Sequence, residues 1–516
     1  MDYLKVSKAT DLQGKDRKLY RILEILPGTL SWGTLIGLTI LSYFFPVGVA
    51  FFIIAFDVYW LLLVTFLGIH LIISYRRMQA NIKINWQQKC LTLKEEQIKN
   101  PYIKDWKDVI HLVIFPTYQE GLEVIRPSIQ ALLNDGYPTE KMIVVLAIEE
   151  RAGPAARKRA RIIEKEFGGK FLYFLTTVHP DNIVGELKGK GANQAWAARQ
   201  VKKEIIDPKK IDYNRILVSV FDIDTIVYPG YFFCLTYNFL TNKKPYHASY
   251  QPVPVYHNNI WQSPFFARVA ASSNTFWQMM QQIRVEKLAT YSSHSMTWRA
   301  LIDIDFWATN MVSEDSRIFW HCFCYYRGDY RVIPLHFPVS MDVCMGKNMI
   351  ETAKNLYKQQ RRWGWGVENV PYLIFNTIKH WKELPHKKMI SRILVQLYGF
   401  HSWATNALII AVVGWMPLLL GGDDFNNTVL SGNLPLISRT LMTLAMGGLV
   451  LSAIISTLLL PPRPKKYGIG KSLVMVIQWI ILPVSIIFFG AIPGLEAQTR
   501  LMLGKYMGFW VTPKNR

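Results

Sequence analysis

Residues 216–224 read Ile-Leu-Val-Ser-Val-Phe-Asp-Ile-Asp, a largely apolar run that ends in two aspartates one residue apart. The part from Ile216 to Phe221 predicts a buried strand, because strands covered on both faces contain few polar residues. Asp222 and Asp224 follow this strand directly. Ligands of open α/β sheets bind beyond the carboxyl ends of the strands, so we expect this pair of carboxylates at a functional edge of the sheet.

Three further short apolar runs precede this strand and alternate with helical stretches. The predicted strands are Val109–Phe115, Met142–Ile148 and Phe171–Leu175, and a helix around Ala195–Val201 separates the last of them from Ile216. Strands that alternate with helices predict an α/β fold: a doubly wound, mostly parallel sheet with helices on both faces.

Long apolar blocks flank this soluble region, and each is about as long as the ~20 residues that cross a bilayer. The predicted spans cover residues 30–54 and 57–75 before it, and 393–420, 437–460 and 470–493 after it. Asp57 is expected at the turn between the first two spans. The chain therefore divides into an N-terminal transmembrane hairpin (1–76), a soluble domain (77–390) and a C-terminal transmembrane region (391–516).

The charge pattern predicts an integral multi-pass membrane protein, with the soluble domain in the cytoplasm, most simply at the cell (inner) membrane. The chain has 59 Lys+Arg against 37 Asp+Glu, and basic residues concentrate beside cytoplasmic ends of spans. The basic loop Pro461–Lys466 and the basic tail after Gly494 both favour the cytoplasm, although one full span between them would separate them. Pro483 leaves a kinked or re-entrant last segment open. Basic residues interleaved with aromatic ones are not found outside the membrane flanks, so nucleic-acid binding is not expected.

The Asp222-Ile223-Asp224 triplet carries the first candidate chemistry. Two carboxylates this close can hold Mg²⁺ or Mn²⁺ against a diphosphate, because these hard cations prefer oxygen ligands and accept phosphate oxygens as well. The cation then stabilises the charge of a leaving diphosphate. The alternative is a turn or capping aspartate at the end of the strand.

Ser313-Glu314-Asp315 forms a second acidic group. Asp315 is the candidate general base that takes a proton from an acceptor hydroxyl. The alternative interpretation is a helix start, with Ser313 as N-cap and the two acidic residues in the first turn, which is compatible with catalysis.

Residues 359–363 read Gln-Gln-Arg-Arg-Trp and lie close to the return into the membrane. Arg362 suits a diphosphate because its planar guanidinium makes bidentate contacts. Gln359 and Trp363 are candidates for binding an acceptor sugar, with the indole as a stacking face. A basic interfacial helix anchored by a Trp is the alternative, and one helix can do both.

In this order, the three motifs resemble those of glycosyltransferase family 2, in particular the membrane-embedded branch of cellulose synthases, hyaluronan synthases and related lipid glycosyltransferases. That branch carries an acidic residue after the second strand, then D-x-D, T-E-D and Q-x-x-R-W. Further matches are Phe115–Glu120, similar to the opening that holds the nucleoside, Lys188–Asn193, and Phe509–Lys514, similar to the gating loop of cellulose synthases.

The resemblance implies a GT-A domain, a divalent cation, and a role for each matching residue. Asp315 and Glu314 would be catalytic, and Asp222 and Asp224 would bind the metal. The implied nucleotide-sugar contacts are Pro116, Thr117, Tyr118, Glu120, Glu149, Glu150, Lys188, Asn193, Asp222 and Arg362. The implied gating residues are Phe509, Val511, Thr512 and Lys514. Two departures are a Glu at 149 or 150 where Asp is usual, and Ser313 in place of Thr.

The expected function is an inverting transfer of a sugar from a nucleotide-sugar, most simply a UDP-sugar, to a growing polysaccharide. Transfer to a membrane lipid and processive synthesis both stay open, because Q-x-x-R-W occurs in both branches of the family. A transporter without catalysis is disfavoured, since few ionisable residues (Asp57, His70 and His401) fall in the apolar blocks. A dinucleotide-dependent dehydrogenase is disfavoured too, because G-x-G-x-x-G does not follow the first strand.

Overall fold

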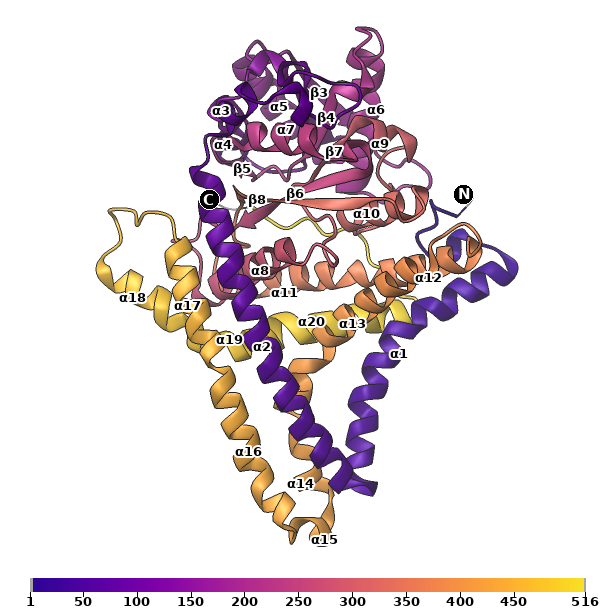
Figure 1. Ribbon diagram of the computed structural model, residues 1–516, viewed down its shortest axis with the longest axis vertical. Helices are drawn as coiled ribbons and strands as arrows, with labels where there is room; N and C mark the ends of the chain where they lie inside the picture. The colour runs from indigo at the N-terminus through magenta and orange to yellow at the C-terminus, as the bar shows by residue number, and fades with distance from the viewer. Residues whose placement is uncertain (1–2, 515–516) are drawn as a thin grey trace.

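A computed structural model describes residues 3–514 and places an α/β domain at one end of a bundle of long helices (Figure 1). The strands are β1 (Ile110–Thr117), β2 (Met142–Glu149), β3 (Tyr173–His179), β4 (Ile216–Val220), β5 (Ile226–Val227), β6 (Ala248–Val255), β7 (Ser295–Thr297) and β8 (Arg331–Ser340). The four strands predicted from the sequence are therefore confirmed.

The strands form one sheet in the order β3-β2-β1-β4-β7-β6-β8-β5. Neighbours from β3 to β4 are parallel, as are β6 and β8, whereas β7 runs antiparallel to β4 and β6, and β5 to β8. The doubly wound, mostly parallel fold is confirmed, and the antiparallel strands lie in the half of the sheet that follows the Asp222 triplet.

Both faces of the sheet are covered by apolar helices. Leu112 and Ile114 of β1 face a core shared with α6 (Lys190–Val201) and α10 (Glu314–Tyr325). Val113 and Phe115 face the opposite core, shared with α4 (Leu122–Leu133), α5 (Gly153–Phe167) and α7 (Tyr231–Thr241). Alternate residues thus bury on opposite sides, which explains why the predicted strands are apolar throughout.

The further helices of this domain are α3 (Trp86–Leu91), α8 (Phe265–Ile283), α9 (Trp298–Asp303), α11 (Met349–Gly364) and α12 (Asn369–Lys379). Of these, α8, α11 and α12 contact the long helices. Figure 1 shows α8 and α11 between the sheet and the helix bundle, so these two helices form the floor of the domain.

The N-terminal hairpin consists of α1 (Gly14–Phe44) and α2 (Pro46–Lys83), and both are long and apolar enough to cross a membrane. The expectation of a turn at Asp57 is wrong, because the chain reverses at Phe45 and Pro46 starts α2. Proline fits the first helical turn, where its missing N–H would have no partner. Asp57 lies inside α2, where its carboxylate accepts a hydrogen bond of 2.6 Å from the Ser438 hydroxyl.

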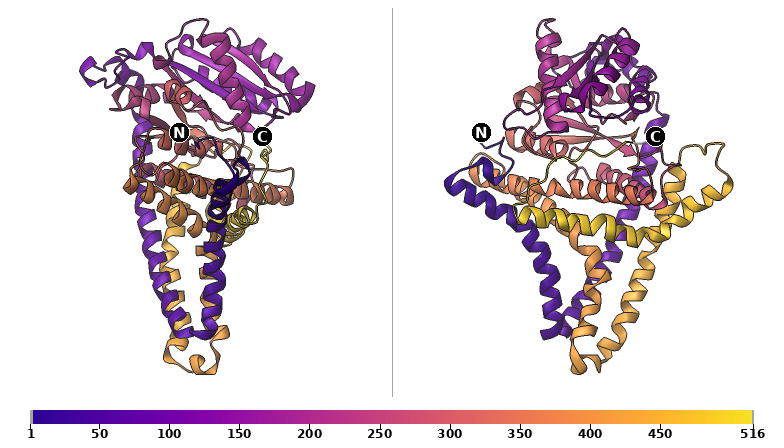
Figure 2. Two further views of the ribbon diagram at one scale, coloured as in Figure 1. Left: turned by 90° about the vertical axis from the view of Figure 1, so that its right-hand side faces the viewer. Right: turned by 180° about the vertical axis from the view of Figure 1, so that it is seen from behind.

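The C-terminal region begins with α13 (His386–Ala411) and continues through a 41° bend into α14 (Met416–Leu420) and α15 (Gly422–Asn426). The chain returns through α16 (Val429–Ala445) and α17 (Gly447–Leu459). Figures 1 and 2 show α14 and α15 at the end of the bundle farthest from the sheet, where the sequence places an acidic loop without basic residues.

The last apolar segment comprises α18 (Ile469–Ile477), α19 (Leu482–Ile486) and α20 (Ile492–Met502), and it too passes the length and hydropathy test for a span. Figures 1 and 2 nevertheless show α19 and α20 lying across the domain end of the bundle, crosswise to α1, α2 and α16. Pro461–Lys466 and the tail after α20 therefore lie on the same side as the domain. This arrangement removes the conflict between the two basic segments.

The tail is fixed to the first helix by Arg21. Its guanidinium donates hydrogen bonds to the backbone carbonyls of Leu501 and Met502 at the end of α20, and also pairs with the buried Glu24. The Glu24 carboxylate accepts a hydrogen bond of 2.8 Å from the Tyr506 hydroxyl and another from the Ala9 amide. The N-terminal segment, α1 and the tail thus meet at one buried carboxylate.

The closest approach between α11 and α20 depends on glycine. A Cβ at Gly364 would lie 3.2 Å from the Gly494 Cα and 3.4 Å from the Ala497 Cβ. We expect Gly364→Val to destabilise the protein by about 1–3 kcal/mol through overpacking, seen as a lower melting temperature in detergent. Gly33→Val is the matched control, because nothing lies within 4 Å of a Cβ at Gly33. Equal melting temperatures for the two variants would contradict this packing.

Candidate active site

Asp222 and Asp224 follow β4, and each carboxylate is paired with a lysine. The Asp222 Oδ1 lies 2.7 Å from the Lys190 Nζ. Asp224 is fully buried, and its Oδ2 accepts hydrogen bonds of 2.7 Å from the Lys514 Nζ and 2.8 Å from the Asp342 backbone amide. The two carboxylates that the sequence pairs are thus brought to one edge of the sheet, as expected.

Lys190, at the start of α6, joins the D-x-D triplet to the second acidic group. Its Nζ lies 2.8 and 3.0 Å from the Asp315 carboxylate oxygens and 3.9 Å from the Glu314 Oε1. Gly191 permits this approach, because a Cβ there would lie 2.8 Å from the Ala308 carbonyl oxygen and 3.2 Å from the Glu314 Cβ. The starts of α6 and α10 therefore meet around one ammonium group.

The charges in this cluster shift one another's protonation. Burial would lower the pKa of Lys190, but Asp222, Asp315 and Glu314 outweigh it and hold that pKa above its usual value. Burial would likewise raise the pKa of Asp222, but Lys190 and Lys514 hold it below its usual range. Burial and then the neighbouring Asp315 raise the pKa of Glu314. Asp222 is therefore charged and Glu314 readily protonated.

The start of α10 is held by Glu368, which follows the Gln359–Trp363 motif. The Glu368 Oε1 accepts hydrogen bonds from the Ser313 amide (3.0 Å) and hydroxyl (2.5 Å), and its Oε2 accepts one of 2.9 Å from the Trp365 indole. The predicted helix start is confirmed, with Ser313 at the N-cap position and Glu314 and Asp315 in the first turn, although the Ser313 hydroxyl donates to Glu368 and accepts no capping hydrogen bond. A buried carboxylate thus fixes the position of Glu314 and Asp315.

The Gln359–Trp363 motif lies near the end of α11, beside α20. Gln359 is buried, and Trp363 and Arg362 are half-buried. Neighbouring α11 residues bind Glu496 of α20, through the Tyr357 hydroxyl at 2.7 Å and the Arg361 guanidinium at 2.6 Å. The motif therefore sits on a helix at the domain end of the membrane bundle, as both interpretations of the sequence allowed.

The tail from Lys505 to Lys514 runs back between the domain and α11 (Figure 2). The Phe509 ring lies 5.0 Å from the Arg362 guanidinium, and a Cβ at Gly189 would collide with that ring. Thr512 is buried and Val511 half-buried, and the Lys514 ammonium ends at Asp224. Of the expected gating residues, Lys514 thus contacts the acidic cluster, and Phe509 lies beside Arg362 and Gly189.

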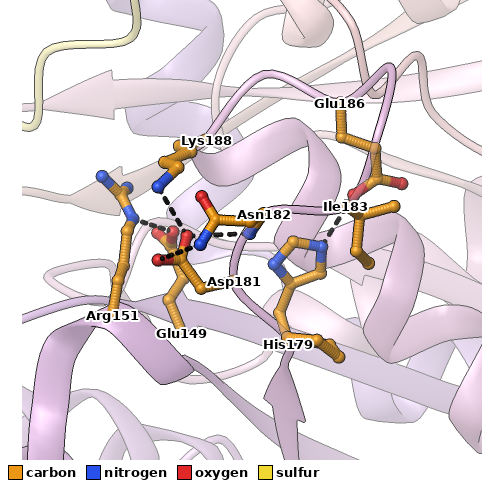
Figure 3. Close-up of a pocket in the computed structure, with 9 residues that line it drawn as sticks. Glu149, Arg151, His179, Asp181, Asn182, Ile183, Glu186 and Lys188 are labelled. Atoms are coloured by element: carbon orange, nitrogen blue, oxygen red, sulfur yellow. Dashed lines mark hydrogen bonds and ion pairs between the residues drawn. The ribbon is translucent and has the colours of Figure 1, made fainter.

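A cleft with about 300 Å³ of empty space, open solvent included, lies at the carboxyl ends of β2 and β3 (Figure 3). Glu149 lines it and forms a 2.5 Å ion pair with Arg151, whose guanidinium lies 4.5 Å from the centre of the Tyr118 ring. Lys188 also lines it and pairs with Asp181 at 2.8 Å. The cleft thus offers charged groups of both signs.

Other residues expected at the nucleotide shape this region. The Glu120 carboxylate accepts hydrogen bonds from the Thr117 hydroxyl and the Tyr118 amide, which fixes the loop after β1. The Asn193 side chain donates to the Ala147 carbonyl and ties α6 to β2. Pro116 lies within β1. Glu150 is about half exposed and pairs with Arg157, so of these two glutamates Glu149 is the one that lines the cleft.

Several residues of this site were missed from the sequence. Lys190 falls between two motif positions, Glu368 lies beyond the last motif, and Arg151 follows the acidic pair. His294 is buried next to β7: its Nδ1 lies 2.9 Å from the Tyr291 carbonyl oxygen, and among residues 3–514 its Nε2 has no hydrogen-bond partner. Of these residues, only Arg151 could have been found from the sequence, because an arginine directly after two glutamates predicts an ion pair.

Residues 217–422 match the model of the family described as Glycosyl transferase family group 2. No curated protein matches the chain. Among solved structures, a mannosyltransferase from Pyrobaculum calidifontis, determined with GDP-Man and Mn²⁺, superposes with a TM-score of 0.40 and 13% identity over 78% of this chain and 98% of that one. TarS from S. aureus superposes with a TM-score of 0.34 and 12% identity, over 68% and 55% of the two chains.

The fold and the acidic site define a glycosyltransferase with a GT-A-type domain and helices long and apolar enough to cross a membrane. Its residues 217–422 are similar to glycosyltransferases of family group 2, in agreement with the resemblance of its motifs.

Glu368 offers a test of how the start of α10 is held. We expect Glu368→Ala to lower the free energy of unfolding by about 1–3 kcal/mol, because the Ser313 and Trp365 donors lose their buried acceptor. Melting temperature in detergent is the measurement. Glu383→Ala is the control: Glu383 is 43% exposed and forms a 3.5 Å pair with Arg327, and surface pairs contribute about 0–1 kcal/mol. Similar losses of stability in both variants would contradict the proposal that Glu368 holds the start of α10.

Proposed function

We propose that this glycosyltransferase moves a sugar from a nucleotide-sugar, of the UDP type, to the hydroxyl of a growing polysaccharide. In this proposal residues 77–390 form the transferase domain on the cytoplasmic side of the cell membrane. Residues 1–76 and 391–516 anchor it there. The basic loop Pro461–Lys466 and the basic tail on the domain side support this orientation, because such segments favour the cytoplasm.

One observation carries the proposal: Asp222 and Asp315 contact the same ammonium group, at 2.7 and 2.8 Å. The first carboxylate belongs to the proposed diphosphate site and the second is the proposed base. A sugar transferase needs these two groups on adjacent sides of the anomeric carbon, so that the acceptor oxygen attacks while the diphosphate leaves.

The nucleoside is proposed to bind in the cleft of Figure 3, which Glu149 and Lys188 line, with the Tyr118 ring beside the lining residue Arg151. The cleft and the acidic cluster are joined by the short segment from Lys188 to Lys190, so a base in the cleft directs its diphosphate toward Asp222. Arg362 and Lys514 lie on the tail side of the cluster and are proposed to balance the diphosphate charge.

The residues present fit a divalent cation only together with the diphosphate. In the described chain, no group of three or more His, Cys, Asp or Glu side chains could hold a metal ion alone. Mg²⁺ and Mn²⁺ sites of this kind take one or two carboxylates and complete their shell with phosphate oxygens and water, so Asp222 and Asp224 suffice. When bound, the cation stabilises the negative charge of the departing nucleoside diphosphate.

In the proposed step Asp315 accepts the proton of the acceptor hydroxyl as its oxygen bonds to the anomeric carbon. The bond from that carbon to the diphosphate oxygen breaks, and its electron pair leaves with the nucleoside diphosphate. One displacement inverts the anomeric centre. Glu368 keeps Asp315 in position through Ser313, and Gln359 and Trp363 are proposed to hold the acceptor sugar.

Transfer to a membrane lipid is the second candidate. α11, which carries Gln359 and Trp363, packs along α20 at the domain end of the membrane helices (Figure 1). An acceptor bound there lies close to the headgroup level of a bilayer, so a lipid-linked sugar could reach the site without leaving the membrane.

The direct test is a transfer assay with the full-length protein in lipid nanodiscs, Mn²⁺ or Mg²⁺, and radiolabelled UDP- or GDP-sugars. A long product retained on a gel would establish polysaccharide synthesis, and a short, solvent-extractable product would establish lipid transfer. We expect Asp315→Asn to lower kcat by roughly 10²–10⁴-fold, because the acceptor loses its general base. Nucleotide affinity should change little.

Glu314→Gln is the matched comparison for Asp315→Asn. Because burial raises the pKa of Glu314, glutamine imitates its protonated form, and we expect roughly tenfold loss or less. Equal losses in the two variants would contradict the assignment of Asp315 as the base. Absence of transfer and of nucleotide release from every donor, with folded protein, would overturn the proposed function.

Removal of divalent cations tests the role of Asp222 and Asp224. We expect excess EDTA to abolish transfer and a return of Mn²⁺ to restore it, because the leaving diphosphate loses its charge stabilisation without the cation. Full activity in EDTA, measured by release of the nucleoside diphosphate, would contradict the role of the cation. It would show that the lysines at these carboxylates are enough to stabilise the leaving diphosphate.

A further inference from the structure

Lys190 is a largely buried basic residue to which the motifs assign no role. The resemblance singles out Lys188 and Asn193, and Lys190 lies between them. The Lys188 side chain is 49% exposed and pairs with Asp181 in the nucleoside cleft, whereas that of Lys190 is 11% exposed and points into the acidic cluster. Two lysines two residues apart thus face different parts of the site.

The Lys190 ammonium sits where several carboxylates converge. It lies 2.7 Å from Asp222 and 2.8 Å from Asp315, with Glu314 at 3.9 Å. An ammonium group has three N–H donors and no acceptor, so it can donate to the carboxylates of Asp222 and Asp315 together. Without this charge, the carboxylates of Asp222 and Asp315 would face each other across a largely buried space, which is unfavourable.

Lys514 plays the same part at the second aspartate of the triplet. Its Nζ lies 2.7 Å from the Asp224 Oδ2, and its side chain is 14% exposed. Both carboxylates proposed as cation ligands are therefore neutralised by lysines of this chain. A divalent cation that arrives alone must displace an ammonium group from each of them. One that arrives with a diphosphate brings negative charge that the displaced lysines can bind.

We propose that Lys190 is a positioning residue that serves as the resident counter-ion of the site. Its ammonium neutralises Asp222 until a nucleotide and its cation enter together, and then stays on Asp315 to hold that carboxylate toward the acceptor. The enzyme therefore binds a divalent cation with the nucleotide and excludes the free cation. This inference rests on the proposed function, because it takes Asp222 as a ligand of the donor's cation.

The test is Mn²⁺ binding, followed by the electron paramagnetic resonance signal of the free ion, with full-length protein in nanodiscs. The unmodified protein should bind Mn²⁺ at least tenfold more tightly with UDP than without it. Lys190→Gln should bind Mn²⁺ without UDP roughly tenfold more tightly than the unmodified protein, because the competing ammonium is gone. Lys188→Gln is the matched control for this readout and should leave the UDP-free affinity unchanged.

Two outcomes would overturn the proposal: equal UDP-free affinities for Lys190→Gln and the unmodified protein, or equally tight binding of Mn²⁺ by the unmodified protein with and without UDP. If Lys190→Gln does not fold, the Mn²⁺ affinities of the unmodified protein with and without UDP still test the proposal. Lys190→Arg keeps the charge and should retain the low UDP-free affinity.

Kinetics distinguish positioning from a purely structural role. With saturating Mn²⁺, Lys190→Gln should lower kcat while the KM for the donor changes less than threefold, because Asp315 loses its anchor and the nucleoside cleft is intact. An increase in KM with unchanged kcat would refute the positioning role. Loss of transfer in the unmodified protein would instead reject the proposed function, so the two failures are distinguishable.

Discussion

The ammonium group of Lys190 is the contact on which the arrangement of the site depends. It draws the end of β4, the start of α6 and the start of α10 to one point, since Asp222 and Asp315 bind it from different elements. Carboxylates this close repel one another unless a cation lies between them. Lys190 lies between Gly189 and Gly191 in the sequence. Because these two residues have no side chain, the Phe509 ring can pack against Gly189 and the start of α10 against Gly191.

On the side of the site that faces the long helices lie α11, α20 and the tail that follows α20. α20 lies across the ends of the long helices, and α11 packs on it through Gly364, an ion pair from Arg361 to Glu496 and a hydrogen bond from Tyr357 to Glu496 (Figure 1). Arg21 and Glu24 then hold the start of the tail that follows α20, and this tail reaches Asp224 with Lys514. The tail thus connects α1 to the acidic cluster.

The parallel half of the sheet was predictable because its strands are buried on both faces and read as continuous apolar runs. The crosswise course of α18–α20 was not, since these residues are as apolar as a true span, and only their packing against α11 and α13 distinguishes them. The hairpin turn was misplaced because Asp57 is polar, yet a buried serine contact accommodates it within α2. The composition of a segment shows that it is apolar enough to cross a membrane, but it does not show how the segment is oriented relative to the other helices.

The same distinction applies to the site. The resemblance of the motifs assigned Asp222, Asp224, Asp315 and Lys514 to one site. The structure brings them together: the two aspartates of the triplet follow β4, Asp315 lies at the start of α10, and Lys514 reaches Asp224 from the tail. The resemblance could not find Lys190 or Glu368, whose roles come from contacts across more than fifty residues of sequence or from a partner on another helix. Both supply a charge or an acceptor that a motif residue needs once it is buried. Partners of this kind follow from asking what neutralises each buried acid, a question that only a structure answers.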